Sequence, residues 1–316
     1  MDGPERPAAY SPSVEAVLRP QPTATVAGRY LLLEQIGVGG MGSVWRARDT
    51  RARREVAVKV LGQHSGALLV RFVREQSVRI RHPHVVAPTG WAAEDDLVVL
   101  SMDLVSGGSV KELVDRHGPL PAGFAALLLE QLLLGLAAVH GAGLVHRDVK
   151  PANLLLEATG TGTPHLRLAD LGVAAPIADQ RYTTVPGAIG TDGYMAPEQA
   201  QGALPDPRQD LYAVGRVGLQ LVTGLPPARQ VEVPSHPLRP LLEPLLVTDP
   251  EQRLPTADAA LRLLRRLDVP PEPGPPIHDR LGPAPRGPVD WGGWAAVAAC
   301  VAVVLGCLVV GLAALV

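Results

Sequence analysis

A polar series in the middle of the chain contains the residue types that metal-assisted chemistry requires. The run His146-Arg147-Asp148-Val149-Lys150-Pro151-Ala152-Asn153 places a carboxylate, an ammonium and an amide in one loop. A second carboxylate follows in Asp170-Leu171-Gly172, after a strand-like segment. Asp and Asn supply the oxygen ligands that suit Mg²⁺. The spacing lets these groups converge on one point, and the sequence therefore predicts a magnesium-binding site there.

A glycine-rich run stands earlier in the chain, between two strand-like segments. It is Gly37-Val38-Gly39-Gly40-Met41-Gly42-Ser43-Val44. Glycines let backbone amides approach phosphate oxygens without a side-chain collision. The run lacks the Lys-Ser/Thr ending of a Walker-type loop. Taken alone, it fits a simple glycine-rich hairpin equally well.

A single lysine is embedded in the apolar run Val56-Ala57-Val58-Lys59. An inward-pointing ammonium is costly unless it is paired with an opposite charge. Glu75, on the helix expected next, is the predicted partner. A solvated lysine on an edge strand is the alternative.

The elements around these residues change character along the chain. Apolar and β-branched runs predict strands at 30–36, 43–48, 55–61 and 97–105, with one helix at 70–80. Longer apolar runs predict helices at 124–140, 210–223 and 256–267. We therefore expect an α+β fold in which a small β-rich lobe precedes a larger helical lobe.

Taken in order, these motifs resemble the eukaryotic-like Ser/Thr protein kinases of bacteria. The matching series from about Gly28 to Leu267 is GVGGMGSV, VAVK, a helix glutamate, HRDVKPAN, DLG, GTDGYMAPE and an Asp-Leu-Tyr that opens the next long helix. The resemblance implies a two-lobed protein kinase fold. It also implies transfer of the γ-phosphoryl group of ATP, with Mg²⁺ or Mn²⁺, to Ser/Thr hydroxyls of proteins.

The resemblance assigns a role to each motif. It implies that Lys59 binds the α- and β-phosphates and pairs with Glu75, and that Asp148 accepts or orients the substrate hydroxyl proton. Lys150 would stabilise the γ-phosphoryl group, and Asn153 and Asp170 would hold the metal. The implied ATP-binding residues are Ile36, Gly37, Gly39, Gly40, Gly42, Val44, Ala57, Lys59, Glu75, Asp103, Val105 and Leu155.

Further residues have structural or regulatory roles by the same resemblance. Glu198 and Arg253 match a buried ion pair, and Asp210 matches a carboxylate that braces the catalytic-loop backbone. Arg147 before Asp148 implies control by phosphorylation of the loop 172–196, which offers Thr183 and Thr184 as acceptors. A phosphate there would give Arg147 a charge-assisted partner.

The remaining parts of the chain indicate how the domain is attached. Residues 1–27 are expected to be a disordered leader, 28–268 the kinase domain (28–105 and 106–268 as its lobes), and 269–289 a Pro/Gly-rich tether. Residues 291–316 carry no charge and are long enough for one transmembrane helix, with a buried core helix as the alternative. We expect a single-pass protein of the cell membrane with a cytoplasmic kinase domain.

Composition and local departures limit the functional choices. A formal net charge of −2 argues against nucleic acid as a partner. The segment 224–249 is about half as long as the resemblance implies, which leaves substrate docking open. A membrane-tethered pseudokinase scaffold that signals by docking is the alternative function, and a small-molecule kinase of related fold is a third hypothesis. A homodimer remains open.

Overall fold

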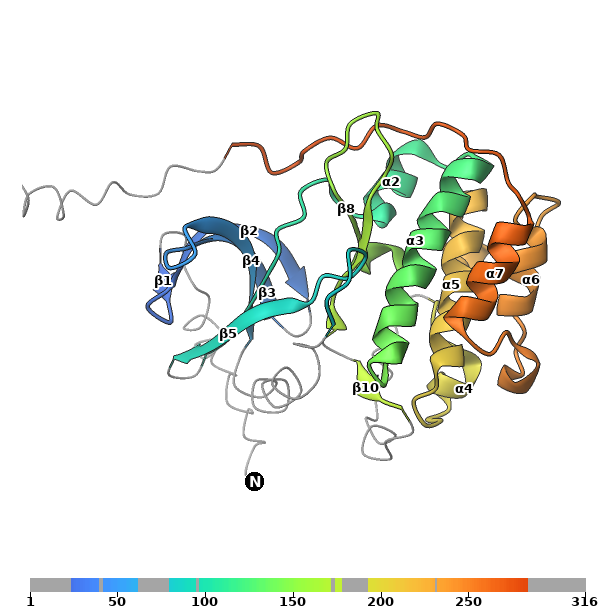
Figure 1. Ribbon diagram of the computed structural model, residues 1–316, viewed down its shortest axis with the longest axis horizontal. Coiled ribbons are helices and arrows are strands. Elements are labelled where there is room, and N and C mark those ends of the chain that lie inside the picture. The colour runs from blue at the N-terminus through green and yellow to red at the C-terminus, as the bar shows by residue number, and fades with distance from the viewer. Residues whose placement is uncertain are drawn as a thin grey trace, which may run out of the picture.

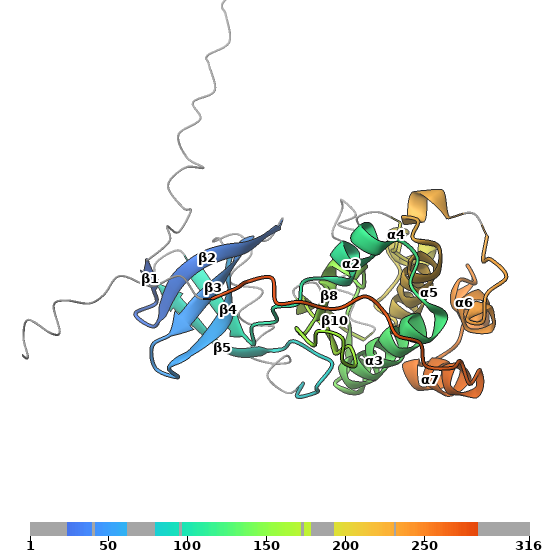
Figure 2. The same cartoon turned by 90° about the horizontal axis from the view of Figure 1, so that it is seen from above.

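The computed structural model describes residues 24–39, 42–61, 80–94, 97–171, 174–177, 193–230 and 232–283. These residues form a small lobe built on a β-sheet beside a larger helical lobe (Figures 1 and 2). The expected two-lobed α+β architecture is therefore confirmed for this part of the chain. The helix expected at 70–80 lies outside the described residues, except for Ile80.

The small lobe is an antiparallel sheet whose described strands run in the order β1-β2-β3-β4-β6-β5. The strands are β1 Thr25–Val26, β2 Tyr30–Gly39, β3 Gly42–Asp49, β4 Arg54–Leu61, β5 Pro88–Glu94 and β6 Leu97–Met102. The sequence did not indicate β5, because Pro88 and Gly90 interrupt its β pattern. The strand expected at 97–105 ends at Met102, because the chain then leaves the sheet to enter the large lobe.

The register of this sheet decides which side chains face the cleft. Trp45 lies opposite Val58 across β3 and β4, and both are in the small-lobe core. Lys59 follows Val58 and so points to the other face of the sheet, where Val44 lies opposite it. One-residue alternation thus puts the lysine and the glycine-loop valine on the same surface.

The large lobe is organised around its longest helix. The bounds of its helices are α2 Val110–His117, α3 Ala122–Gly141, α4 Pro197–Ala200, α5 Pro207–Thr223, α6 Arg239–Leu245 and α7 Ala257–Arg266. Its short strands are β7 Leu144–Val145, β8 Leu154–Leu156, β9 Leu166–Leu168 and β10 Ala175–Pro176. Helix α6 lies inside the segment 224–249, and the sequence did not indicate it because Pro240 and Pro244 interrupt the pattern.

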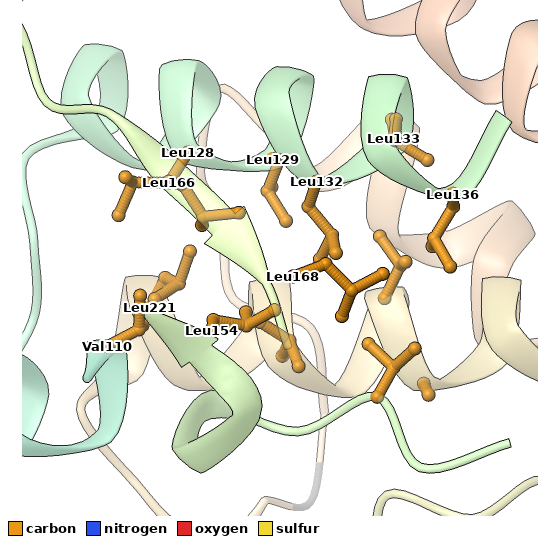
Figure 3. Packing of buried hydrophobic residues seen from close by; sticks show 14 of the residues in the cluster. Val110, Leu128, Leu129, Leu132, Leu133, Leu136, Leu154, Leu166, Leu168 and Leu221 are labelled. Carbon is orange, nitrogen blue, oxygen red and sulfur yellow. The ribbon is translucent and has the colours of Figure 1, made fainter. Parts of the chain in front are cut away.

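Leucines of α3 form the centre of the large-lobe core (Figure 3). Leu128, Leu129, Leu132, Leu133 and Leu136 are each at most 1% exposed. Each such burial stabilises the fold by about 2 kcal/mol. Within the described residues, α3 is the helix that is long and apolar enough to cross a bilayer, but 61% of its most apolar window is buried inside the domain. The expected span at 291–316 lies outside the described residues.

The chain after α7 does not leave the domain. Residues 269–283 run back from α7 across the link between the lobes and reach the small lobe (Figures 1 and 2). Ile277 in this segment is 2% exposed and belongs to the large-lobe core. The part of the expected tether that the structure describes, residues 269–283, is therefore packed on the domain, with the apolar residue Ile277 buried among the prolines.

A buried ion pair connects the start of α4 to the loop before α7. The Arg253 guanidinium contacts Glu198 twice, with Nη1–Oε1 at 2.7 Å and Nη2–Oε2 at 3.2 Å. The Arg253 side chain is 0% exposed and that of Glu198 is 16% exposed. Backbone carbonyls of Val247, Arg208 and Thr248 accept the other guanidinium hydrogen bonds. The pair therefore fixes three separate segments of the large lobe.

Removing the Glu198 carboxylate should destabilise the domain strongly. We expect Glu198→Ala to lower the free energy of unfolding by about 3–5 kcal/mol, because Arg253 keeps a buried charge without its counter-ion. The control is Glu130→Ala, which breaks a 2.8 Å ion pair with Arg265 whose side chains are 30% and 58% exposed. That change should cost about 1 kcal/mol or less. Equal losses in chemical denaturation would contradict a structural role for the buried pair.

Candidate active site

The glycine-rich run forms the turn between β2 and β3. Gly39 pairs with Gly42 at the end of the ladder, and the tip residues Gly40 and Met41 lie outside the described residues. Gly42 has φ +141°, and a Cβ there would lie 2.1 Å from the Val60 carbonyl oxygen. No other residue type fits that position without moving β4. The close approach of the hairpin to β4 therefore depends on this glycine.

Lys59 connects the two lobes through an ion pair. Its Nζ lies 2.6 Å from Oδ1 of Asp170, and its side chain is 11% exposed. The two residues stand on β4 and on the segment after β9, 111 positions apart in the sequence. Glu75, the partner expected from the sequence, lies outside the described residues. The ammonium is thus held at the cleft by a carboxylate from the large lobe.

The catalytic-loop residues gather around the Asp148 carboxylate. The Asn153 amide donates to the Asp148 carbonyl oxygen at 2.8 Å and to its Oδ2 at 2.9 Å. Lys150 Nζ lies 2.9 Å from the same Oδ2. A 3₁₀ turn over Pro151–Asn153 brings the amide back toward the aspartate. One acid, one cation and one amide therefore share a single location.

A short hairpin aligns this loop with the second carboxylate. β8 and β9 pair with Leu154 opposite Leu168, directly after Asn153 and shortly before Asp170. The Ala169 N–H donates to the Asn153 carbonyl oxygen at 2.8 Å. Asp170 has φ +64°, a left-handed conformation that Asp tolerates better than most residues. The hairpin register thus places Asn153 and Asp170 side by side.

A fully buried carboxylate holds the start of the catalytic loop. Asp210, in the first turn of α5, accepts hydrogen bonds from the backbone N–H groups of His146 and Arg147, each at 2.8 Å. Its Oδ2 also lies 2.8 Å from Nε2 of His140. Arg147 adopts φ +66°, so the carboxylate stabilises a backbone turn that is otherwise unfavourable.

The electrostatics of Asp210 follow from these contacts. Burial alone would raise the pKa of its carboxyl group. The hydrogen bonds from the His140 side chain and the His146 backbone outweigh that effect and leave the pKa of Asp210 below its ordinary value. Burial lowers the pKa of the Arg147 guanidinium, and the charge of Asp210 opposes that change. Asp210 therefore supplies a fixed negative charge beneath the loop.

The apolar residues that the resemblance assigns to ATP binding belong to β2, β3, β4, the link between the lobes and β8. Ala57 is buried, and Ile36, Val44, Val105 and Leu155 are partly buried. Leu155 points away from its neighbours Leu154 and Leu156, which are in the large-lobe core. The partial exposure of these residues leaves apolar surface on both lobes.

The side chain of Asp103 is engaged elsewhere in the link. Its carboxylate forms ion pairs with Arg54 at 3.0 Å and with Arg167 at 3.1 Å. Burial would raise the pKa of Asp103, but hydrogen bonds from both guanidinium groups lower it below its usual value. The Asp103 carboxylate therefore connects β4 of the small lobe with β9 of the large lobe.

Several contributors to the site were not singled out by sequence reasoning. His146 is completely buried, with Nε2 3.0 Å from the Ala169 carbonyl oxygen, and the Gln199 amide donates to the Arg147 carbonyl oxygen at 2.9 Å. His146 is the first residue of the polar motif, and this position could have indicated its role from the sequence. No sequence feature indicated the role of Gln199, because only the fold brings α4 to the catalytic loop. Thr183 and Thr184 lie outside the described residues.

The oxygen atoms of Asn153 and Asp170 suit a metal ion that is also coordinated by the phosphates of a bound nucleotide. Asn153 and Asp170 offer hard oxygens, and among the described residues no group of three or more His, Cys, Asp or Glu could hold a metal ion. Mg²⁺ is commonly bound through one or two carboxylates together with substrate phosphates. This donor set therefore suits a magnesium–nucleotide complex better than a closed protein cage.

Comparison with known proteins gives the family. A profile of the protein kinase domain matches residues 30–262. The chain is similar to serine/threonine-protein kinase PkaA of Streptomyces coelicolor, with 35% identity over 273 residues that cover 76% of this chain and 50% of PkaA. It is also similar to serine/threonine-protein kinase PknA of Mycobacterium tuberculosis, with 34% identity over 301 residues covering 84% of this chain and 68% of PknA.

A third relative is serine/threonine-protein kinase PrkC of Bacillus subtilis, with 34% identity over 204 residues, 63% of this chain and 31% of PrkC. The chain thus spans about half the length of PkaA and a smaller share of PrkC. The family profile nevertheless covers most of the chain, including the site described above. The chain therefore belongs to the protein kinase domain family.

Proposed function

We propose that this chain is an active Ser/Thr protein kinase that transfers the γ-phosphoryl group of ATP to protein hydroxyl groups. The observation that carries the proposal is the convergence of Asp148, Lys150 and Asn153, with the Lys59–Asp170 pair reaching across the lobes. Phosphoryl transfer depends on positioning and charge neutralisation more than on covalent help. Cations and oxygen ligands are the groups gathered here.

Each residue has a defined task in this proposal. Lys59 neutralises and orients the nucleotide phosphates, and Asp148 orients the substrate hydroxyl and receives its proton. Lys150, 2.9 Å from Asp148, stabilises negative charge on the transferred group. Asn153 and Asp170 hold Mg²⁺, which would neutralise phosphate charge when bound. Asn153 also keeps the Asp148 carboxylate in one orientation by donating to it.

A pseudokinase scaffold is the second candidate function. It would use the same fold for docking and would not need the Asp148 carboxylate. The presence of every polar group that the reaction requires favours catalysis over this alternative. The names of the relatives, all serine/threonine-protein kinases, support protein hydroxyls as acceptors rather than small molecules.

Replacing the Asp148 carboxylate should abolish transfer. We expect Asp148→Asn to lower the rate of autophosphorylation with Mg-ATP about 10²–10⁴-fold, because the proton acceptor is lost. Lys59→Met should also be inactive. Asp115→Asn is the matched control, since this exposed aspartate forms an ion pair with Lys111 of the same helix. Radiolabelled phosphate transfer by Asp148→Asn at the wild-type rate would contradict the role given to Asp148, and an absence of transfer by the wild type would favour the scaffold.

Phosphorylation of the loop 172–196 is expected to activate the enzyme. Mass spectrometry after incubation with ATP should find phosphate on Thr183 or Thr184, where it would give Arg147 a charge-assisted partner. The double variant Thr183→Ala/Thr184→Ala should lose activity about tenfold toward an added protein substrate. Thr163→Ala, in an exposed loop of the large lobe, is the control. A fully active double variant would contradict this regulation.

Membrane attachment through 291–316 completes the proposal. The segment is uncharged and begins with Trp291 and Trp294, residues that favour the interface of a bilayer. Since ATP is cytosolic, the kinase domain would lie on the cytoplasmic side. Seven residues separate Pro283 from Trp291, and they span at most about 25 Å when fully extended. Because residue 282 contacts the small lobe, that lobe would lie nearer the bilayer.

Charges in the proposed span should release the protein from membranes. We expect Leu305→Arg/Leu308→Arg to move the full chain to the soluble fraction, since each arginine costs about 3 kcal/mol at the centre of a span. The control is Leu204→Arg/Leu225→Arg, at positions that are each 40% exposed on the kinase domain. The control should sediment with membranes after carbonate washing, as the wild type does. Retention of the double-arginine span variant would argue against a transmembrane anchor.

A further inference from the structure

The segment after α7, residues 269–283, is called the strap below. It makes its first contacts on α3 of the large lobe. The Gly123 N–H donates to Glu272 Oε2 at 2.8 Å, and a Cβ on Gly123 would lie 2.1 Å from the Pro270 carbonyl oxygen. A Cβ on Gly274 would lie 2.1 Å from the Phe124 ring. Glycine on each side therefore permits backbone contact that any larger residue would prevent.

The middle of the strap is held by a core residue. Ile277 is 2% exposed and exchanges two backbone hydrogen bonds with Gly160, both 2.8 Å long. Its Cγ2 lies 2.6 Å from the place of a Cβ on Gly107, in the link between the lobes. Burial of Ile277 and the paired hydrogen bonds together fix which strap residue lies opposite Gly160.

The strap then binds the link itself. The Arg280 N–H donates to the Ser106 carbonyl oxygen at 2.8 Å. The Arg280 guanidinium lies 3.0 Å from the Glu112 carboxylate. This carboxylate also caps the start of α2, because it accepts a hydrogen bond from the Ser109 N–H. The first attachment is made to the chain that connects β6 with α2, and the second is made to the first turn of α2. The strap therefore covers the segment about which the lobes would move.

The last described residues of the strap reach the small lobe. Arg46 of β3 donates to the carbonyl oxygens of Leu281 and Gly282 at 3.1 and 3.2 Å. The Arg46 guanidinium is nearly buried and also pairs with Glu34 and Glu55. A rigidly held cation thus fastens the strap to a strand that begins at the glycine-rich turn.

We propose that the strap is a positioning element of the catalytic unit, which limits the separation of the lobes and so holds the glycine-rich turn over the nucleotide. It is attached to the large lobe, to the link and to β3 at separate points, so the lobes cannot separate widely without breaking one of these contacts. Strand β3 is paired with β4, in which Ala57 and Lys59 face the cleft. The part of this inference that concerns nucleotide binding rests on the kinase activity proposed above.

The first test uses the purified full chain in detergent and the variant Arg280→Ala, with Arg280→Lys as the conservative counterpart. Arg265→Ala is the matched control, because its ion pair with Glu130 lies within the large lobe. Hydrogen–deuterium exchange should increase in peptides 103–109 and 42–49 of Arg280→Ala, and remain unchanged in α5. KM for ATP should rise about threefold while kcat stays nearly constant, because the variant weakens lobe closure and leaves the groups that carry out phosphoryl transfer unchanged.

A second variant releases the strap at its core anchor. Ile277→Ser should give the same exchange pattern and raise KM for ATP about tenfold. Arg280→Lys should restore most of the wild-type behaviour. The proposal is overturned if Arg280→Ala and Ile277→Ser match Arg265→Ala in both measurements, or if exchange rises evenly across both lobes. If the wild type shows no kinase activity, the proposed function fails. The exchange pattern alone then tests whether the strap limits the separation of the lobes.

Discussion

The hydrogen bonds that Asp210 accepts from His146 and Arg147 are the contacts on which the site depends. They fix the backbone that carries Asp148, Lys150 and Asn153, and they stabilise the left-handed conformation of Arg147. A carboxylate without exposed surface cannot rearrange cheaply, since any other geometry would leave a buried charge unpaired. Helix α5 supplies this carboxylate, and the packing of α5 against α3 therefore sets the position of the catalytic loop.

The two lobes are joined by more than the chain that links them. Lys59 and Asp170 meet at the cleft, while Asp103 pairs with Arg54 of the small lobe and Arg167 of β9. The strap adds one connection to the link and another to β3 of the small lobe. The cleft and the link are thus each bridged by charged groups. The Lys59–Asp170 and Arg167–Asp103 pairs are partly buried, so salt screens them less than the exposed Arg54–Asp103 pair.

Much of the fold could be predicted because local patterns are strong. The leucine-rich run of α3 and the alternating residues of β3 and β4 indicated their element types, with ends off by at most two residues. Helix α6 and strand β5 could not be predicted, because prolines and a glycine mask their periodicity. The strap was expected to be a tether, since composition describes the average residue, whereas its attachment depends on a few particular residues such as Ile277 and Arg280.

By itself, the sequence determined the chemistry of the site: which acids, amides and cations stand in one order, and that a glycine-rich turn precedes them. These features are local, so residue type and spacing define them. Only the tertiary structure decided which groups meet. Lys59 lies beside Asp170, Gln199 beside the catalytic loop, and residues 269–283 across both lobes. Such contacts join distant segments through core packing, and no short window of the sequence contains that information.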